Sequence, residues 1–248
     1  MLLRVERKYL VPNDKMEAIR ERISHFVRPD IYTRNNGSGY PEYTVRSIYF
    51  DSKDFSCYAE KHEGLMLRRK FRIRGYNEET EDSKVVMEIK RKIQARQKKY
   101  RAFVNYKDIE KLLERGNPEK YVISNGNGNL PVIDAGKFLF HIKKRQFIPT
   151  CLVVYEREPY HGKLDEGVRI TFDKNIRSRL FPTMDSLYEE RELKQLFKRH
   201  FILEIKYYRH DMPVWARSIV QEFRLRNDAL SKYTIGIDVN RDKVLTTY

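Results

Sequence analysis

The stretch LRRKFRIRGY, residues 67–76, carries the pattern from which the fold can be worked out. Alternate residues of a β-strand point to opposite faces. One face of this stretch then holds Leu67, Arg69, Phe71 and Ile73. The other face holds an unbroken basic row, Arg68, Lys70, Arg72 and Arg74. Such a row is either a surface in water or the lining of a site for a highly charged anion.

Strand-like segments recur along the whole chain. Residues 2–11, 43–51, 65–76, 84–92, 99–106, 151–158, 168–176 and 201–208 are rich in β-branched or aromatic residues and show partial alternation. The polar segment NEETEDS separates the third from the fourth, and a Gln- and Lys-rich segment separates the fourth from the fifth. Short links of this kind favour antiparallel neighbours.

The other strands repeat the division between an apolar face and a charged face. Glu and Lys are spaced two apart in three of them, as Glu6 and Lys8, Glu88 and Lys90, and Glu204 and Lys206, and Arg157 and Arg169 occur in two more. Each Glu–Lys pair would lie on one side of its strand, about 6 to 7 Å apart. For any single strand, a sheet with one face in water explains the pattern. The recurrence of basic residues favours a shared site.

Helical patterns between these strands complete an α+β fold. Residues 15–26, 108–116, 132–146 and 214–226 are predicted to be helical. Neither a repeat nor a linker divides the chain, so residues 1–248 are predicted to form a single domain. If such strands close into a barrel, alternation sends every charged face inward or every one outward, and the inward choice leaves the apolar faces outside, where the helices could cover them.

Composition limits the class of partner. The chain of 248 residues is 40% hydrophobic and carries 50 Lys and Arg against 35 Asp and Glu, a net charge of +15. This charge favours a polyanion. Nucleic acid is not expected, because the strands lack the exposed aromatic residues that stack on single-stranded bases. Neither a P-loop nor a G-x-G-x-x-G motif occurs.

Cys57 and Cys151 form no metal or disulfide motif, and no apolar run is long enough to span a membrane, so we expect a cytoplasmic protein.

An inward-facing charged lining would need a polyanion and a divalent cation to balance it. Arginine suits bidentate contacts with phosphate, and the candidates are Arg72, Arg74, Arg157 and Arg169. Lys8, Lys90 and Lys206 would supply point charges. The carboxylates Glu6, Glu88 and Glu204 are candidates to hold Mg²⁺ or Mn²⁺, which prefer oxygen ligands.

An ordered set of motifs resembles a known family. VERKYLV, SIYFDS, RRKFRIRGY, VVMEIKRK, VVYEREPY, VRITFD, ILEIKY and ALSKYTIG follow one another from residue 5 to about residue 237. Together they resemble the triphosphate tunnel metalloenzymes, and among these the polyphosphate polymerase domain of the vacuolar transporter chaperone (VTC) type. Almost the entire chain is covered. The resemblance implies a closed antiparallel β-barrel of about eight strands that forms a tunnel, with the charged faces inside and the helices packed outside.

The resemblance implies roles for particular residues. Arg72, Arg74, Arg157 and Glu204 correspond to the catalytic set. The phosphate-binding set would be Lys8, Arg72, Arg74, Lys90, Arg157 and Lys232, with Arg169 and Lys206 at further motif positions. Glu204 would be the principal metal ligand, with Glu6 and Glu88 beside it. Lys232 has no periodic pattern around it and is identified by the motif alone; it is expected to follow a helix.

The function implied is metal-dependent transfer of the γ-phosphate of ATP to a growing inorganic polyphosphate chain. Hydrolase and cyclase branches of the superfamily begin with E-x-E-x-K, whereas Arg4 stands here at the position of the first Glu. This difference agrees with the VTC-like branch. A tripolyphosphatase or nucleoside triphosphatase, or a catalytically silent polyphosphate-binding module, stays open. The resemblance also allows a membrane partner protein, which would hold the chain peripherally at a membrane, and it leaves the oligomeric state open.

Overall fold

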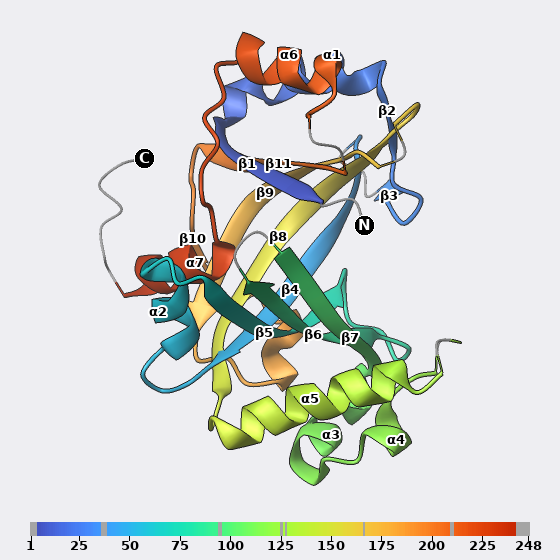
Figure 1. Ribbon diagram of the computed structural model, residues 1–248, viewed down its shortest axis with the longest axis vertical. Helices are drawn as coiled ribbons and strands as arrows, with labels where there is room; N and C mark the ends of the chain where they lie inside the picture. Colours follow the sequence, from blue (N-terminus) through green and yellow to red (C-terminus); the bar gives the residue numbers. More distant parts are fainter. Residues whose placement is uncertain are drawn as a thin grey trace.

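A long, curved antiparallel sheet forms the centre of the computed structural model (Figure 1). The structure describes residues 4–35, 39–93, 96–124, 126, 128–165, 167–208 and 211–241. Along the sheet, hydrogen-bonded neighbours follow the order β1-β11-β9-β8-β4-β5-β6-β7. The antiparallel α+β class predicted from the alternation is confirmed.

The strands lie within a few residues of the predicted segments. They are β1 (Val5–Pro12), β4 (Pro41–Asp51), β5 (Leu67–Tyr76), β6 (Lys84–Ile93), β7 (Arg96–Asn105), β8 (Ile148–Gly162), β9 (Arg169–Leu180) and β11 (His200–Tyr207). Three short strands pair along the flanks and were not predicted: β2 (Val27–Pro29), β3 (Arg34–Asn35) and β10 (Lys194–Gln195).

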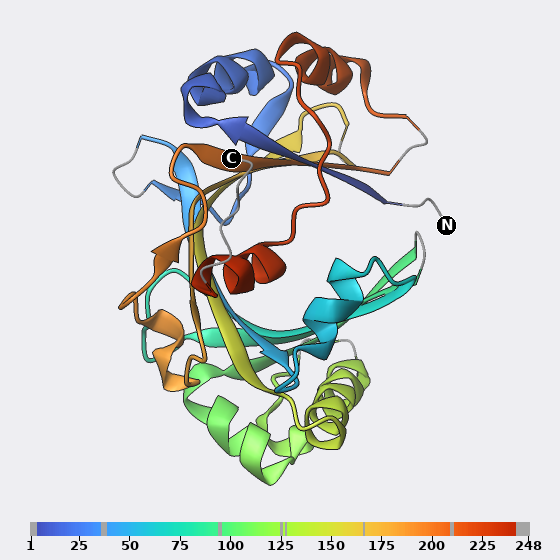
Figure 2. The ribbon, with the colours of Figure 1, turned by 90° about the vertical axis from the view of Figure 1, so that its left-hand side faces the viewer.

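The sheet curls so that its two arms face each other (Figure 2). Lys90 on β6 lies 3.8 Å from Glu6 on β1, although five strands separate β6 from β1 in the sheet order. We call the face that carries these residues the inner face. The charged sides of β1, β5, β6, β7 and β11 point inward, as expected for a shared site. On β4 the inner residues are Tyr43, Val45, Ser47 and Tyr49, and Arg46 lies on the outer side.

The expectation of a closed barrel is wrong. Among the described strands, none pairs with the free edge of β7 or with the free edge of β1, so the sheet stays open between them. Like charges flank this gap: burial together with Arg101, Lys206 and Arg4 lowers the pKa of Lys99 on β7 to about 8. Electrostatic repulsion across the gap opposes closure of the sheet.

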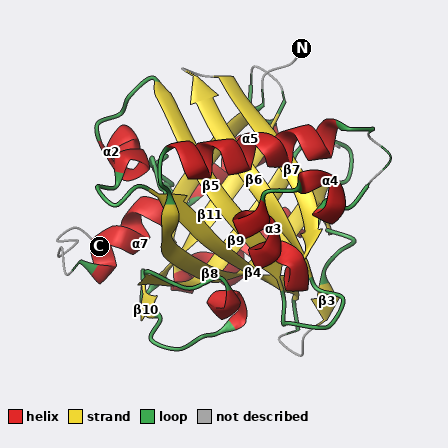
Figure 3. Ribbon diagram, turned by 90° about the horizontal axis from the view of Figure 1, so that it is seen from below, coloured by secondary structure: helices red, strands yellow, loops and turns green. Residues whose placement is uncertain are grey.

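Helices cover the outer face, where the apolar sides of the strands form the core. Against β5, β6 and β7 lies α5 (Leu130–Lys144), next to α3 (Ile109–Arg115) and α4 (Pro118–Tyr121) (Figure 3). At the other arm, α1 (Met16–Ser24) and α6 (Val214–Glu222) contribute to the core beneath β1, β9 and β11. All four predicted helices are present, and a 3₁₀ turn (Asn13–Lys15) precedes α1.

Three α-helices of the described residues were not predicted: the short α4, α2 (Ser56–His62) and α7 (Lys232–Asn240). Tyr233 and Ile237 of α7 pack against Cys151, which shares a strand face with Arg157, so α7 lies on the inner side of the sheet. The Tyr58 hydroxyl of α2 donates to Asp238 of α7 at 2.5 Å. Figure 2 shows α7 between the two arms. Lys232 follows α6 in the chain, as expected, and it also begins α7, which was not predicted.

Candidate functional site

The first group of charged residues on the inner face joins β1 to β11 and β6. Lys8 lies 3.1 Å from Glu6 and 3.6 Å from Glu204, and Lys206 pairs with Glu204 and lies 3.9 Å from Glu6. Burial and Glu204 raise the pKa of Glu6, but Lys8, Lys90 and Lys206 outweigh them and lower it to about 2. We call these five residues the Glu204 cluster. Both carboxylates are ionised near neutral pH.

The second group is built on β5, β6 and β7 around Glu88. Arg72 approaches this buried carboxylate to 2.5 Å, Arg101 to 2.8 Å and Arg74 to 4.0 Å. Arg72 also donates to the Tyr49 hydroxyl at 3.1 Å, and Arg74 donates to the Ser47 hydroxyl at 3.1 Å. These bonds fix the direction of both guanidinium groups. We call Glu88 and the three arginines the Glu88 cluster.

The third group joins β8, β9 and α7. Arg157 donates two hydrogen bonds, of 2.7 and 2.8 Å, to the fully buried carboxylate of Asp173, and Lys232 pairs with the same carboxylate. Burial opposes the charge of Asp173, but Arg157 and Lys232 lower its pKa to about 2. Both basic groups lie over the ring of Tyr155, at 5.2 and 4.6 Å from its centre. We call the three charged residues the Asp173 cluster.

The start of α7 is fixed by two basic residues of the inner face. Ser231 caps the helix by accepting a hydrogen bond from the Thr234 amide, and Lys70 donates to the Ser231 hydroxyl at 2.7 Å. Lys8 donates to the Leu230 carbonyl at 3.2 Å. Tyr233 donates to Asp51 at 2.5 Å, and Asp51 also accepts from two backbone amides of α2. The side chain of Lys232 is thereby placed beside Arg157.

The structure brings most of the predicted residues together on the inner face. The three clusters contain Lys8, Arg72, Arg74, Lys90, Arg157, Lys206, Lys232, Glu6, Glu88 and Glu204. Arg169 stands beside Lys206 in the strand register, yet its guanidinium donates to Asp30 at 3.0 Å and to the Tyr43 hydroxyl at 3.1 Å. Arg169 therefore lies at the margin of the site.

Four charged residues of the site were missed as site residues by sequence reasoning. Arg101 and Lys99 face inward from β7, where they stand opposite Glu88 and Lys90 in the register. Asp173 anchors the third cluster, and Lys70 anchors α7. All four lie on the charged side of their strands. Alternation in residues 99–106 places Lys99 and Arg101 on one face. The argument used for residues 67–76 would therefore have identified both residues.

A divalent cation fits the Glu204 cluster better than the Glu88 cluster. The Glu88 cluster has one carboxylate, which accepts from two arginines and has a third within 4.0 Å, whereas the Glu204 cluster has two carboxylates, which pair with Lys8 and Lys206. Glu6 and Glu204 lie close enough for Glu204 to raise the pKa of Glu6. The described residues include no group of three or more acidic, His or Cys side chains able to hold a metal. Mg²⁺ or Mn²⁺ would take its other ligands from phosphate and water, as Mg²⁺ does in many nucleotide sites.

Aromatic residues follow the basic rows on the inner face. Phe103 comes two residues after Arg101, and Tyr76 comes two residues after Arg74, so each shares its arginine's face. Their exposed fractions are 38% and 39%, and Tyr76 meets the ring of Tyr43 edge to face at 5.7 Å. The expectation that the strands lack exposed aromatic residues is therefore wrong at Phe103 and Tyr76. An aromatic ring that stays exposed beside such charged residues offers a planar group a surface to stack on.

A family model described as VTC domain matches residues 3–240. No curated protein matches the chain. Among solved structures, a putative adenylyl cyclase from Hippeastrum, described as having a dominant triphosphatase activity, is 10% identical with a TM-score of 0.49, covering 95% of this chain and 96% of that chain. The siderocalin Ex-FABP is 7% identical with a TM-score of 0.15, covering 73% of this chain and 85% of that chain. Both likenesses are too distant to carry a conclusion about function.

Proposed function

This chain belongs to the VTC domain family, and from that premise we propose that it is a metal-dependent polyphosphate polymerase. In the proposed reaction, a terminal oxygen of a polyphosphate chain attacks the γ-phosphorus of ATP. The bond between the γ-phosphorus and the bridging oxygen breaks, ADP leaves, and the chain is one phosphate longer. The attacking oxygen is already anionic near neutral pH, so no side chain has to act as a base.

One observation carries the proposal: on the inner face, basic side chains from both arms and from α7 outnumber the carboxylates that pair with them. Phosphoryl transfer needs mainly positioning and charge stabilisation from a protein. Arg72 and Arg74, held by Tyr49 and Ser47, would bind the oxygen atoms of the transferred group. Arg157 and Lys232 would bind neighbouring phosphates from the opposite side. A divalent cation on Glu204 and Glu6 would neutralise phosphate charge when bound.

The exposed aromatic residues support a nucleotide as the phosphate donor. Phe103→Ala is expected to weaken binding of ATP about tenfold and to leave binding of inorganic tripolyphosphate unchanged, because base stacking on an aromatic residue is worth about 1–3 kcal/mol. Isothermal titration with each ligand measures the two affinities. The matched control is Phe181→Ala, which removes an exposed Phe on the C-terminal side of β9 (58% exposed). Equal losses for both ligands would place Phe103 with the phosphate-binding residues instead.

A hydrolase is the nearest alternative, because water in place of the chain end would give free phosphate from the same site. Purified protein incubated with ATP and Mn²⁺ distinguishes the two. A ladder of long polyphosphate on a gel with release of ADP supports the polymerase, whereas phosphate without a ladder supports the hydrolase. Neither product, with tripolyphosphate raising the melting temperature, would indicate a binding module.

Glu204→Gln and Arg72→Ala test the site itself. Each is expected to lower turnover at least about a hundredfold, because each removes a charge that faces the reacting phosphates. Circular dichroism and thermal unfolding show whether the variants remain folded. Arg226→Ala is the matched control, since this arginine side chain is 93% exposed on a loop. Wild-type turnover in both site variants would refute the assignment of the site.

A further inference from the structure

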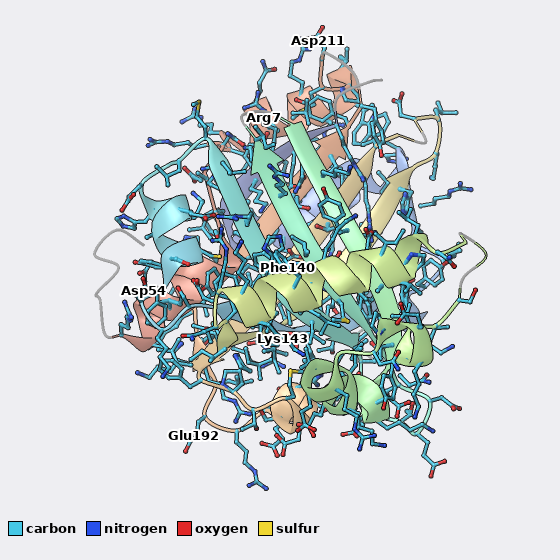
Figure 4. All side chains as sticks on the ribbon, turned by 60° about the horizontal axis from the view of Figure 1, so that its bottom comes forward. Arg7, Asp54, Phe140, Lys143, Glu192 and Asp211 are labelled. Atoms are coloured by element: carbon cyan, nitrogen blue, oxygen red, sulfur yellow. The ribbon has the colours of Figure 1, made fainter. Side chains whose placement is uncertain are left out.

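The crest of α5 presents three large apolar side chains to the outside. Leu130 is 56% exposed, Ile133 is 51% exposed and Phe140 is 56% exposed. With 3.6 residues per turn, Leu130, Ile133, Lys137, Phe140 and Lys144 fall along one narrow line. We call this line the α5 crest. Figure 4 labels Phe140 and Lys143 on α5, in front of the sheet.

The fold does not need these apolar side chains. The opposite side of α5 packs Ala135, Phe138 and Leu139 into the core with the outer faces of β5 to β7. A helix that covers a sheet in this way usually has polar residues on its other side. An apolar line on the outer surface of a helix that is already packed marks an interaction surface.

The surroundings of the crest are basic. Lys137, Lys143 and Lys144 belong to α5, Arg145 follows it, and Arg91 and Lys98 are on β6 and β7. The helix has one carboxylate, Asp134, which is buried and pairs with Lys137 at 3.1 Å. Burial, together with Arg69, Arg145, Arg91 and Lys144, lowers the pKa of His141 on the same helix. Arg69, Arg91, Lys144 and Arg145 therefore lie close to His141, the residue next to Phe140 of the crest, whereas the side chain of Lys143 approaches Gly116 at the end of α3.

We propose that the α5 crest binds the surface of an anionic phospholipid membrane. A helix with apolar side chains on one line and basic residues beside them lies in the plane of the bilayer interface, where the apolar groups enter the acyl boundary and the basic groups meet the headgroups. The helices of the described residues include none long and apolar enough to cross a membrane, so α5 would lie flat.

Other occupants fit the crest less well. In a symmetric pair of copies, crest would face crest, and Lys137 and Lys144 would meet the same positive charges. Single-stranded nucleic acid would find one aromatic ring, Phe140, and two aliphatic side chains that cannot stack. An anionic bilayer supplies both an apolar layer and negative charge. The proposal is independent of the reaction on the inner face.

Vesicle flotation tests the proposal. The full chain is mixed with neutral phosphatidylcholine vesicles or with vesicles that also contain phosphatidylglycerol. We expect flotation with the anionic vesicles alone, weakened by salt, and at least about a tenfold loss of affinity for the Ile133→Ser, Phe140→Ser double variant. The control double variant, Leu164→Ser with Phe181→Ser, removes two other exposed apolar residues and should float like the wild type.

Three outcomes would overturn the proposal. The wild type fails to float with anionic vesicles, or the crest variant floats as well as the wild type, or light scattering shows a dimer that the crest variant abolishes. The last result would assign the crest to a second copy of the chain. Tripolyphosphate binding by the crest variant should equal that of the wild type, which shows that the inner face is intact.

Discussion

The charge of Lys90 on the inner face is expected to change near neutral pH. Burial, with repulsion from Lys8 and Arg72, lowers the pKa of Lys90 to about 7, although Glu6 acts in the opposite direction. A bound polyanion favours the charged ammonium and raises this pKa again. Binding above pH 7 therefore takes up a proton. The contribution of Lys90 to affinity is complete below pH 7 and declines as the pH rises above it.

The role of Lys90 can be tested by comparing the pH dependence of tripolyphosphate affinity in the wild type and in Lys90→Met. From pH 6.5 to 9, the ratio of tripolyphosphate affinities between the wild type and Lys90→Met should fall several-fold, since the variant has no proton to lose at this position. The ratio removes the ionisation of tripolyphosphate itself, which is common to both. Isothermal titration in buffers of different ionisation enthalpy measures the proton uptake. A ratio that is constant with pH would contradict the role of Lys90.

For a single residue, the sequence pattern predicts the strand face on which the side chain lies, but not the residue that it contacts. Alternation placed Arg72 and Glu88 on charged faces, but their contact depends on the register of β5 with β6. Arg157 and Lys232 meet on Asp173, although 75 residues separate them in the chain. Lys232 was identified through the resemblance alone. The position of α7 depends on tertiary packing, which a local sequence pattern does not predict.

The strands were predictable as elements because each is rich in β-branched or aromatic residues and most of them have one apolar and one charged face. Helix α2 has seven residues and follows Phe55 in a left-handed conformation, at φ 61°, so its start carries none of the usual capping residues. Helix α7 packs with β8 and β9 on one side and with α2 on another, so it lacks a single apolar stripe. Helices buried on several sides lose the period by which they are recognised.

The close packing of α7 can be tested at Gly236. A Cβ atom there would lie 3.0 Å from the Ser178 hydroxyl and 3.1 Å from the Cys151 sulfur. Gly236→Val is expected to lower the free energy of unfolding by about 1–3 kcal/mol, because it overfills this contact. It should also weaken tripolyphosphate binding, since α7 carries Lys232. Urea unfolding and titration measure the two effects.

The control is the same substitution in another helix. Gly136 lies within α5, and a Cβ atom at this position would meet nothing within 4 Å. Gly136→Val should leave binding unchanged and leave stability equal or slightly higher, because Val is a better helix former than Gly. Equal stability losses in both variants would indicate that the close approach at Gly236 is unimportant.

For the whole molecule, the recurrence of basic residues favoured a charged inner lining, which β1, β5, β6, β7 and β11 form, and alternation could not predict whether the sheet closes. Closure depends on hydrogen bonds between β7 and β1, and basic residues line both sides of that gap. The outer helices bury apolar faces of the strands whether the sheet is open or closed. An open and a closed sheet have the same pattern in the sequence, so the pattern predicts the lining and leaves the closure undecided.

Because basic groups are crowded on one face, a polyanion should stabilise the folded protein. Tripolyphosphate at about 100 times its dissociation constant is expected to add about 2.7 kcal/mol, which raises the melting temperature by roughly 5–10 °C for a chain of this size. Differential scanning calorimetry with and without the ligand measures the shift. Sulfate at equal ionic strength controls for general screening, and an equal shift with sulfate would argue against a specific site.

The register of β1 determines when this strand can pair during synthesis of the chain. Lys8 stands opposite Glu204 in β11, and Tyr9 also bridges to Asn227. On the ribosome, β1 emerges early and has no strand neighbour until residues 200–207 have been made. Pairings between such distant residues form late and slowly. Glu6 and Lys8 therefore take their places beside Glu204 and Lys206 on the inner face only after β11 has been made.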